Sequence, residues 1–165
     1  MSFSLIACVG KNLELGRENN LIFHIKDDMK FFRATTLNHA VLMGYKTFLS
    51  IGRPLKNRQN FVLSRHDRSF PPEIVQVRDL SRFISENSRT PEEIFVIGGA
   101  TVYQQLLPFA KTLYLTEVSA EDKTADAFFP SFDPEKFEKT TLRSATDPDS
   151  NLKYSIAKYT RKEIS

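Results

Sequence analysis

Short β-rich segments alternate with helical segments along the first two thirds of the chain, and this alternation limits the possible folds more than any other feature. Strands that alternate with helices predict βαβ units, a mainly parallel sheet and helices on the faces of that sheet. The expected strands cover residues 3–9, 40–44, 60–64, 73–77, 93–99 and 112–118. The expected helices cover residues 45–51, 79–88 and 100–110, and a further helix begins after Phe23.

The last part of the chain has a different pattern. Residues 137–146 and 153–162 are strand-like, and the turn-forming sequence DPDSN separates them without an intervening helix. We therefore expect an antiparallel hairpin at one edge of the sheet. The predicted fold is a single α/β domain over residues 1–165, with a mixed, mostly parallel sheet flanked by helices.

Composition supports one domain with a buried core, since the 165 residues are 41% hydrophobic and 26% charged. No stretch approaches the roughly 20 apolar residues of a membrane-spanning helix. The apolar run at residues 3–9 lacks a basic flank and is too short for a signal peptide, so we interpret it as a buried strand. The single cysteine, Cys8, excludes an intrachain disulfide, and together with three scattered histidines it favours no metal site and a cytoplasmic setting.

The net charge of +3 is small, and the basic residues are scattered along the chain. This distribution suits an anionic small molecule at least as well as nucleic acid, because nucleic-acid-binding proteins usually carry a concentrated basic stripe with stacking aromatics.

A long polar connection, GKNLELGRENNLIFH at residues 10–24, follows the first expected strand. Ligands of α/β sheets bind beyond the carboxyl ends of the strands. This connection is therefore either a lid over a binding site or an ordinary surface loop.

Two expected strands lead directly into glycine and then into a helix. Gly44 precedes a helix that opens with Lys46 in its first turn, and Gly98 and Gly99 precede the helix at residue 100. Such turns suit phosphate groups, although each is weak alone and neither is the GxGxxG fingerprint. Arginines that suit carboxylate or phosphate flank another strand at Arg53, Arg58 and Arg65, although most surface arginines are merely solvated.

Two adjacent aspartates begin the helix that follows Phe23. At helical spacing Asp28 shares a face with apolar residues such as Phe32, whereas Asp27 turns toward Lys30. Asp27 has an ordinary explanation in the helix dipole and an ion pair with Lys30. Asp28 is either a cap or a site residue, since a carboxylate among apolar side chains needs a partner in the protein or in a ligand.

The segments SLIACVGKNLELG, DDMKFFRATT, VLMGYKTFLSIGRPLKNRQNFVLSR, VIGGATVYQQLLP, LYLTEV and FFP follow one another along the chain. Together they resemble bacterial dihydrofolate reductase of the chromosomal type from end to end. The resemblance implies NADPH-dependent reduction of dihydrofolate to tetrahydrofolate by hydride transfer to the pterin. That reaction supplies one-carbon metabolism and thymidylate synthesis.

The resemblance also implies roles for single residues. Asp28 corresponds to the acid that binds the pterin and promotes its protonation, and Thr116 to the threonine that supports this acid. Phe32 corresponds to the ring that packs on the p-aminobenzoyl group, and Arg58 to the arginine that binds the α-carboxylate of the glutamyl tail. Catalytic roles are thus expected for Asp28, Phe23 and Thr116, and substrate contacts for Ile6, Ala7, Met29, Phe32, Arg33, Ile51, Leu55, Arg58 and Ile97.

NADPH is the cofactor that the resemblance implies, and Gly98-Gly99 corresponds to the family's cis glycine peptide. No metal is implied. The expected cofactor contacts are Ala7, Leu15, Gly16, Gly44, Tyr45, Lys46, Thr47, Leu63, Ser64, Arg65, Ile97, Gly98, Gly99, Ala100, Thr101, Val102 and Tyr103.

Four positions depart from the family pattern. Most relatives have Pro-Trp where this chain has Ile22 and Phe23, and phenylalanine cannot donate a hydrogen bond to an ordered water near the pterin. Tyr45 and Thr101 occupy positions where relatives commonly have arginine beside the cofactor's phosphates. We expect Arg65 to compensate, so that NADPH remains preferred over NADH.

Two other functions fit parts of the pattern. A pyrimidine reductase of riboflavin synthesis shares the glycine turns but lacks an acid like Asp28 and the SIGRPL segment. A noncatalytic dinucleotide-binding protein would give Asp28, Thr116 and Arg58 no reason to occur together. We further expect a monomer that binds dihydrofolate and antifolates, and neither nucleic acid nor membrane.

Overall fold

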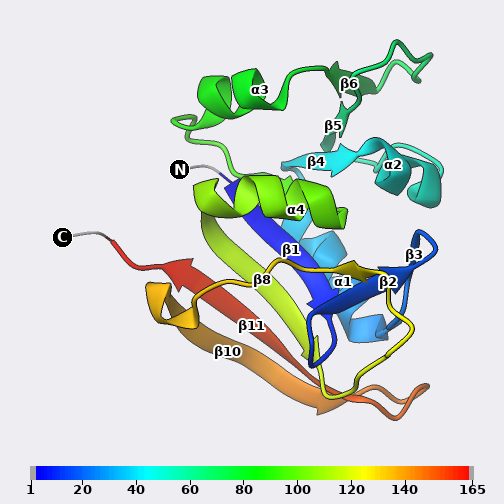
Figure 1. Cartoon of the computed structure of the whole chain (residues 1–165), viewed down its shortest axis with the longest axis vertical. Coiled ribbons are helices and arrows are strands. Elements are labelled where there is room, and N and C mark those ends of the chain that lie inside the picture. The colour runs from blue at the N-terminus through cyan, green and yellow to red at the C-terminus, as the bar shows by residue number, and fades with distance from the viewer. Residues whose placement is uncertain (1–2, 164–165) are drawn as a thin grey trace.

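Eight strands form one mixed sheet in the order β10-β11-β8-β1-β7-β4-β5-β6 (Figure 1). The computed structural model of the chain describes residues 3–163. Neighbouring strands from β8 to β6 run parallel, whereas β11 is antiparallel to both β8 and β10. The predicted mixed sheet and edge hairpin are confirmed. The strands are β1 (Phe3–Val9), β4 (Ala40–Gly44), β5 (Gln59–Leu63), β6 (Ile74–Val77), β7 (Ile94–Val96), β8 (Ala110–Val118), β10 (Phe137–Thr146) and β11 (Lys153–Arg161).

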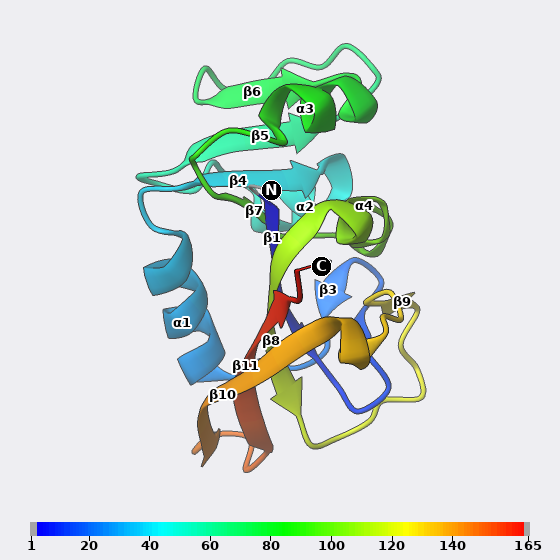
Figure 2. The same cartoon turned by 90° about the vertical axis from the view of Figure 1, so that its left-hand side faces the viewer.

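Helices cover both faces of this sheet. Figure 2 shows α1 on one face and α3 and α4 on the opposite face. The α-helices are α1 (Lys26–Thr36), α2 (Tyr45–Ile51), α3 (Leu80–Asn87) and α4 (Ala100–Leu106), and the short 3-10 helices are η1 (Leu107–Phe109) and η2 (Pro134–Lys136). Asp79 caps α3, because its side chain accepts a hydrogen bond from the Arg82 amide at 3.1 Å. The helix predicted over residues 100–110 ends earlier, at Leu106, because Pro108 follows within η1.

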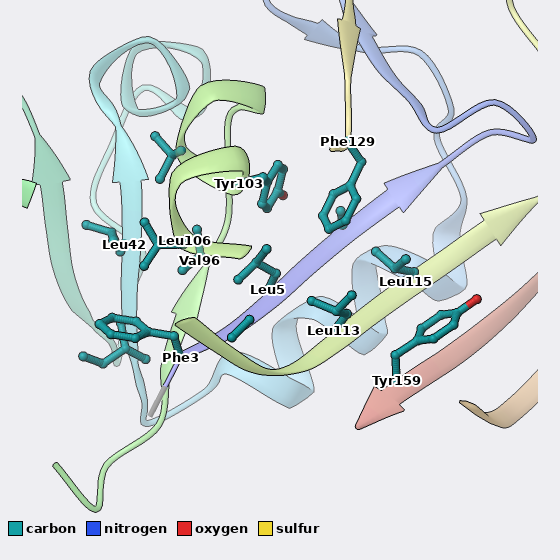
Figure 3. Close-up of a cluster of buried hydrophobic side chains, with 14 of the residues drawn as sticks. Phe3, Leu5, Leu42, Val96, Tyr103, Leu106, Leu113, Leu115, Phe129 and Tyr159 are labelled. Atoms are coloured by element: carbon teal, nitrogen blue, oxygen red, sulfur yellow. The ribbon is translucent and has the colours of Figure 1, made fainter. Parts of the chain in front are cut away.

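The main hydrophobic core includes residues of the sheet and of the helices α3 and α4, and Figure 3 shows the part around β1 and α4. Phe3 and Leu5 contribute from β1, and Tyr103 and Leu106 contribute from α4. All seven residues of β1 are buried, as expected for a central parallel strand covered on both faces. A second cluster packs α1 and α2 against the other face, so that β1 holds residues under both layers.

A second, three-stranded sheet was not predicted from the sequence. Residues 10–24, which the sequence suggested were a polar connection, contain β2 (Glu14–Arg17) and β3 (Asn20–Leu21). Both belong to a sheet in which β2 also pairs with β9 (Ala127–Phe128), far along the chain. Residues 10–24 therefore contain sheet structure and are not a plain loop. Within residues 3–163, no helix is long and apolar enough to cross a membrane.

Candidate active site

A cavity of about 660 Å³ opens beside the carboxyl ends of β1 and β7. Its walls come from α1, α2, the segment after α2, the glycine turn before α4 and the lid segment at residues 10–24. Apolar side chains dominate the lining, and a few polar groups interrupt it. All nine residues expected to contact substrate line this cavity, namely Ile6, Ala7, Met29, Phe32, Arg33, Ile51, Leu55, Arg58 and Ile97.

Asp28 is the only carboxylate among the described residues that line this cavity. Its Oδ1 accepts a hydrogen bond of 2.6 Å from the hydroxyl of Thr116, a residue of β8 that is 1% exposed. Burial raises the pKa of Asp28 above its ordinary value, the bond from Thr116 lowers it and the negative charge of Asp27 raises it. The net shift is upward, so this carboxyl group holds a proton more readily than an exposed aspartate does.

Asp27 points away from the cavity, as predicted, but its partner is not the predicted one. Its carboxylate accepts a hydrogen bond from the Tyr154 hydroxyl at 2.9 Å and forms an ion pair with Arg143, whose Nε lies 2.8 Å from Oδ2. The proposed ion pair with Lys30 is wrong, because β10 and β11 bring a phenol and a guanidinium to the outer side of α1. These bonds hold the first turn of α1 on the hairpin and thereby fix the helix that carries Asp28.

Arg58 lies at the opposite, cationic end of the cavity. Its Nε donates to Thr36 Oγ1 at 2.9 Å, and its terminal nitrogens donate to the carbonyl oxygens of Lys56 at 2.9 Å and Arg33 at 3.3 Å. Burial and the positive charge of Arg33 lower the pKa of Arg58. A guanidinium has five N–H groups, so two remain for an anionic ligand.

Two residues that support this end were not singled out in the sequence. Thr36 is fully buried, and its hydroxyl donates to the Phe32 carbonyl while accepting from Arg58. Asn60 is 1% exposed, and its side-chain amide bonds both the amide and the carbonyl of Leu55 at 2.9 Å. Neither residue type in isolation signals this role, because the bonding partners come together only when α1, β5 and the segment between them have folded.

The glycine turn before α4 forms a third part of the site. The Gly98-Gly99 peptide is cis, as predicted, and Gly98 has a φ of +125°, which requires glycine. A Cβ added at either glycine would meet Thr47 Oγ1 at 3.6 Å, so the missing side chains leave backbone open to the cavity. The Gly44 amide donates to the Gly98 carbonyl at 2.9 Å and holds the ends of β4 and β7 together.

About half of the expected cofactor residues line the same cavity, namely Ala7, Leu15, Gly16, Thr47, Ile97, Gly98, Gly99, Ala100 and Tyr103. The others do not, namely Gly44, Tyr45, Lys46, Leu63, Ser64, Arg65, Thr101 and Val102. Among these, Leu63 and Arg65 border a second hollow of about 850 Å³ beside α3. Val102 is a core residue that is 3% exposed.

Two residues expected to have catalytic roles lie outside the cavity lining. Thr116 acts from behind the wall through its bond to Asp28. Phe23 is 8% exposed and packs in a core cluster with Cys8, Ile25 and others rather than facing the cavity. The position of Phe23 in the sequence did not indicate this burial.

The lid segment forms part of the cavity wall. Arg17, Asn20 and Leu21 line the cavity. The Glu18 amide donates to Asp126 at 3.0 Å, which ties the tip of the lid to the segment just before β9. This arrangement favours the lid over the ordinary surface loop, the two alternatives that the sequence left open for residues 10–24.

Glu14 anchors the base of the lid. Its carboxylate is 1% exposed and accepts hydrogen bonds from the amides of Asn12 at 2.7 Å and Asp122 at 2.6 Å. Bonds from backbone amides lower the pKa of Glu14 although burial acts in the opposite direction. No group of three or more metal-ligating side chains occurs in the described part of the chain.

Comparison with known proteins gives a consistent result. Residues 2–161 match the family model described as dihydrofolate reductase. The chain is 36% identical to a dihydrofolate reductase of Bacillus subtilis over 163 residues, which cover 98% of this chain and 96% of that protein. It is 41% identical to a dihydrofolate reductase of Haemophilus influenzae over 138 residues, which cover 84% of each.

The fold is also found among solved structures. A dihydrofolate reductase from Enterococcus faecalis, complexed with NADP(H) and RAB-propyl, superposes with a TM-score of 0.86. The alignment covers 98% of this chain and 96% of that chain, with 24% sequence identity. At that identity the likeness establishes the fold.

Proposed function

The chain belongs to the dihydrofolate reductase family, and we propose how its own residues carry out that family's reaction, the NADPH-dependent reduction of dihydrofolate to tetrahydrofolate. The observation that carries the proposal is the hydrogen bond of 2.6 Å from Thr116 to Asp28 in the wall of a largely apolar cavity. Thr116 bonds only one oxygen of this carboxylate, so the other oxygen, kept there at a cost in hydration, suits a ligand that pairs with it.

Asp28 is the group that binds the pterin. Its Oδ1 accepts one hydrogen bond from Thr116, so Oδ2 and the second lone pair of Oδ1 can accept from a ligand in the cavity. The amidine-like edge of dihydropterin offers two N–H donors, and a carboxylate suits such a pair of donors. The raised pKa of Asp28 keeps a proton available on this acid-substrate pair, and protonation of the ring nitrogen prepares the neighbouring carbon for hydride.

The rest of the cavity fits the rest of the substrate. Met29 is 56% exposed although it is apolar, and it faces the cavity beside Phe32, so both offer surface to the p-aminobenzoyl ring. Arg58 has two N–H groups left for the α-carboxylate of the glutamyl tail. Antifolates that present a similar pair of donors would bind Asp28 in the same manner.

The glycine turn is where NADPH would be held. Gly98 and Gly99 leave backbone exposed, and Thr47 lies close enough to add a hydroxyl. These groups fit a diphosphate, because it needs close approach to the main chain and hydrogen-bond donors. When bound, NADPH supplies the hydride. Ala7 and Ile97 line the part of the cavity from which the nicotinamide would reach the pterin.

The lid limits the access of water to this chemistry. Its three-stranded sheet and the buried carboxylate of Glu14 hold residues 10–24 against the cavity. Exclusion of water strengthens the pairing between Asp28 and the pterin and protects the transferred hydride. The buried position of Phe23 suggests that it supports the lid by packing, and we propose this supporting role in place of direct contact with the substrate.

We propose that residues 1–165 act as one domain and as a monomer in the cytoplasm. The continuous eight-stranded sheet, which joins elements from both ends of the chain, supports a single domain. The proposed partners are dihydrofolate, NADPH and antifolates, without nucleic acid.

The direct test is the loss of NADPH absorbance after dihydrofolate is added to the purified chain, together with fluorescence titration of NADPH. We expect both binding and consumption of NADPH. Binding without consumption would support the noncatalytic alternative. Consumption with a deaminated pyrimidine intermediate of riboflavin synthesis, but not with dihydrofolate, would support the pyrimidine reductase.

A further inference from the structure

Arg68 stacks on the ring of Tyr45, beyond the edge of the cavity. Its guanidinium carbon lies 3.7 Å from the centroid of the Tyr45 ring. Its Nε donates to the hydroxyl of Ser64 at 3.0 Å, and Ser64 follows β5 directly. The guanidinium is therefore held at two points. One is the ring of Tyr45, the first residue of α2, and the other is the hydroxyl of Ser64, at the carboxyl end of β5.

The loop that carries Arg68 is itself fixed. Gln76 donates to the carbonyl oxygens of Ser64 at 2.8 Å and His66 at 2.7 Å. Phe70 packs edge-to-face against Tyr45, with ring centroids 6.0 Å apart, and also against Phe48. An arginine held this way loses less freedom on binding a ligand than a solvated surface arginine does.

The basic residues near Tyr45 and Ser64 differ in whether their charge is already paired within the protein. Arg78 forms an ion pair with Asp67, so its charge is already compensated. No ion pair within residues 3–163 involves Lys46, Arg65 or Arg68. The terminal nitrogens of Arg68 also donate to no protein group in the described part of the chain. Stacking leaves the edge of the guanidinium free, and that edge can donate two parallel hydrogen bonds to an anion.

The strand order places this arginine at the far end of an extended ligand. The ends of β7, β4 and β5 are consecutive in the sheet, and Gly44 pairs with Leu63 across β4 and β5. Strands lie about 4.8 Å apart, so the end of β5 is about 10 Å from the glycine turn after β7. A dinucleotide whose diphosphate lies at Gly98 would place its adenosine ribose near this strand end, beside Ser64 and Arg65.

We propose that Arg68, oriented by Tyr45 and Ser64, binds the 2′-phosphate of NADPH and is a specificity-determining residue for NADPH over NADH. This inference rests on the proposed function and deepens it, because it names the group that selects the cofactor. The phosphate monoester is a dianion, and it is the only difference between the two cofactors. Tyr45 replaces the arginine that relatives commonly have at this position. The phosphate can still be recognised, because the Tyr45 ring supports Arg68, which comes from another loop.

Binding of adenosine 2′,5′-bisphosphate and adenosine 5′-monophosphate, measured by calorimetry, tests the inference without turnover. Arg68→Ala should weaken binding of the bisphosphate by about 10- to 100-fold, because one charge-assisted contact with the 2′-phosphate is lost. The affinity for the monophosphate should not change. Arg89→Ala is the matched control, since it removes another exposed arginine, one that lies after α3, and it should change neither affinity. Tyr45→Phe should keep the stacking and the affinity, whereas Tyr45→Leu should lose part of the affinity.

Cofactor kinetics give a second readout. In Arg68→Ala, the ratio of kcat/KM for NADPH to kcat/KM for NADH should fall by the same factor, with kcat for NADPH preserved. A ratio and a bisphosphate affinity both within twofold of the parent would overturn the inference. A parent that binds the two nucleotides equally would overturn it as well. In either case turnover of dihydrofolate would still uphold the proposed function, whereas its absence would count against the function itself.

Discussion

Replacement of Thr116 by valine tests how the site sets the proton affinity of Asp28. Valine has nearly the same shape, so Thr116→Val removes the donor of the 2.6 Å hydrogen bond and little else. That bond lowers the pKa of Asp28, against the effect of burial. Its loss should therefore raise the pKa further.

The size of the effect follows from the two charge states of Asp28. A hydrogen bond to a charged group contributes about 1.5–3 kcal/mol and a neutral one about 0.5–1.5 kcal/mol. The hydroxyl thus favours the carboxylate over the neutral acid by roughly 1 kcal/mol. Because about 1.4 kcal/mol corresponds to a tenfold change in an equilibrium constant, Thr116→Val should raise the pKa of Asp28 and shift its ionisation equilibrium toward the neutral acid by roughly fivefold.

The assay is the pH dependence of kcat/KM for dihydrofolate at saturating NADPH, which reports ionisations of the form that binds substrate. Activity should fall as pH rises through the pKa of Asp28, because the ionised acid no longer carries the proton. In Thr116→Val this falling limb should move to higher pH. Thr112→Val is the matched control, since Thr112 is 4% exposed on the same strand and should leave the limb in place. An unmoved limb, or one displaced to lower pH, would refute the reasoning.

The remaining predictions concern other parts of the site. Phe23→Trp should lower the free energy of unfolding by about 1–3 kcal/mol, because the larger ring overpacks a buried position; an unfolding free energy equal to that of the parent would contradict this. Thr36→Val should raise KM for dihydrofolate about fivefold with kcat unchanged, because Arg58 loses an acceptor worth about 1 kcal/mol. Arg65→Ala should reduce the preference for NADPH in steady-state kinetics, and full discrimination would show that Arg65 has no part in it. Asp28→Asn should unfold at higher urea at pH 7, since the raised folded-state pKa makes ionisation costly above the ordinary value of 3.8, and the gain should disappear below that pH.

Much of the fold could be predicted because it depends on local pattern. The strand Phe3–Val9, the strand Ala40–Gly44 and the helix Tyr45–Ile51 occupy the predicted residues. A buried parallel strand is a continuous apolar run, and glycine followed by a helix marks its end. The hairpin of β10 and β11 was predictable because a turn sequence separates two strand-like segments without an intervening helix.

The parts that could not be predicted depend on contacts between distant segments. The strands β2 and β3 have four and two residues, and β2 gains a further partner in β9 only after the chain has folded. Asp27 bonds Arg143 and Tyr154, which lie more than 110 residues along the chain, so helical spacing pointed to the wrong partner.

The residues that support Arg58 and the proposed cofactor site could not be predicted for the same reason. Asn60 and Arg68 have ordinary neighbours in the sequence, and their roles come from loop geometry that no periodicity encodes. Asp28, in contrast, could be identified early, because an acid on an apolar helix face departs from the pattern around it.

The proposed mechanism requires that Asp28 binds the pterin and keeps a proton available to it. The most direct test is kcat/KM for dihydrofolate in Asp28→Asn and in the parent, measured side by side at pH 7 with NADPH affinity as the control for folding. Asparagine keeps the size of the side chain, but it cannot carry the acidic proton, and an NH2 donor replaces one of the two accepting oxygens. Turnover should collapse by orders of magnitude in Asp28→Asn while NADPH binds as in the parent. Turnover within a few-fold of the parent would contradict it.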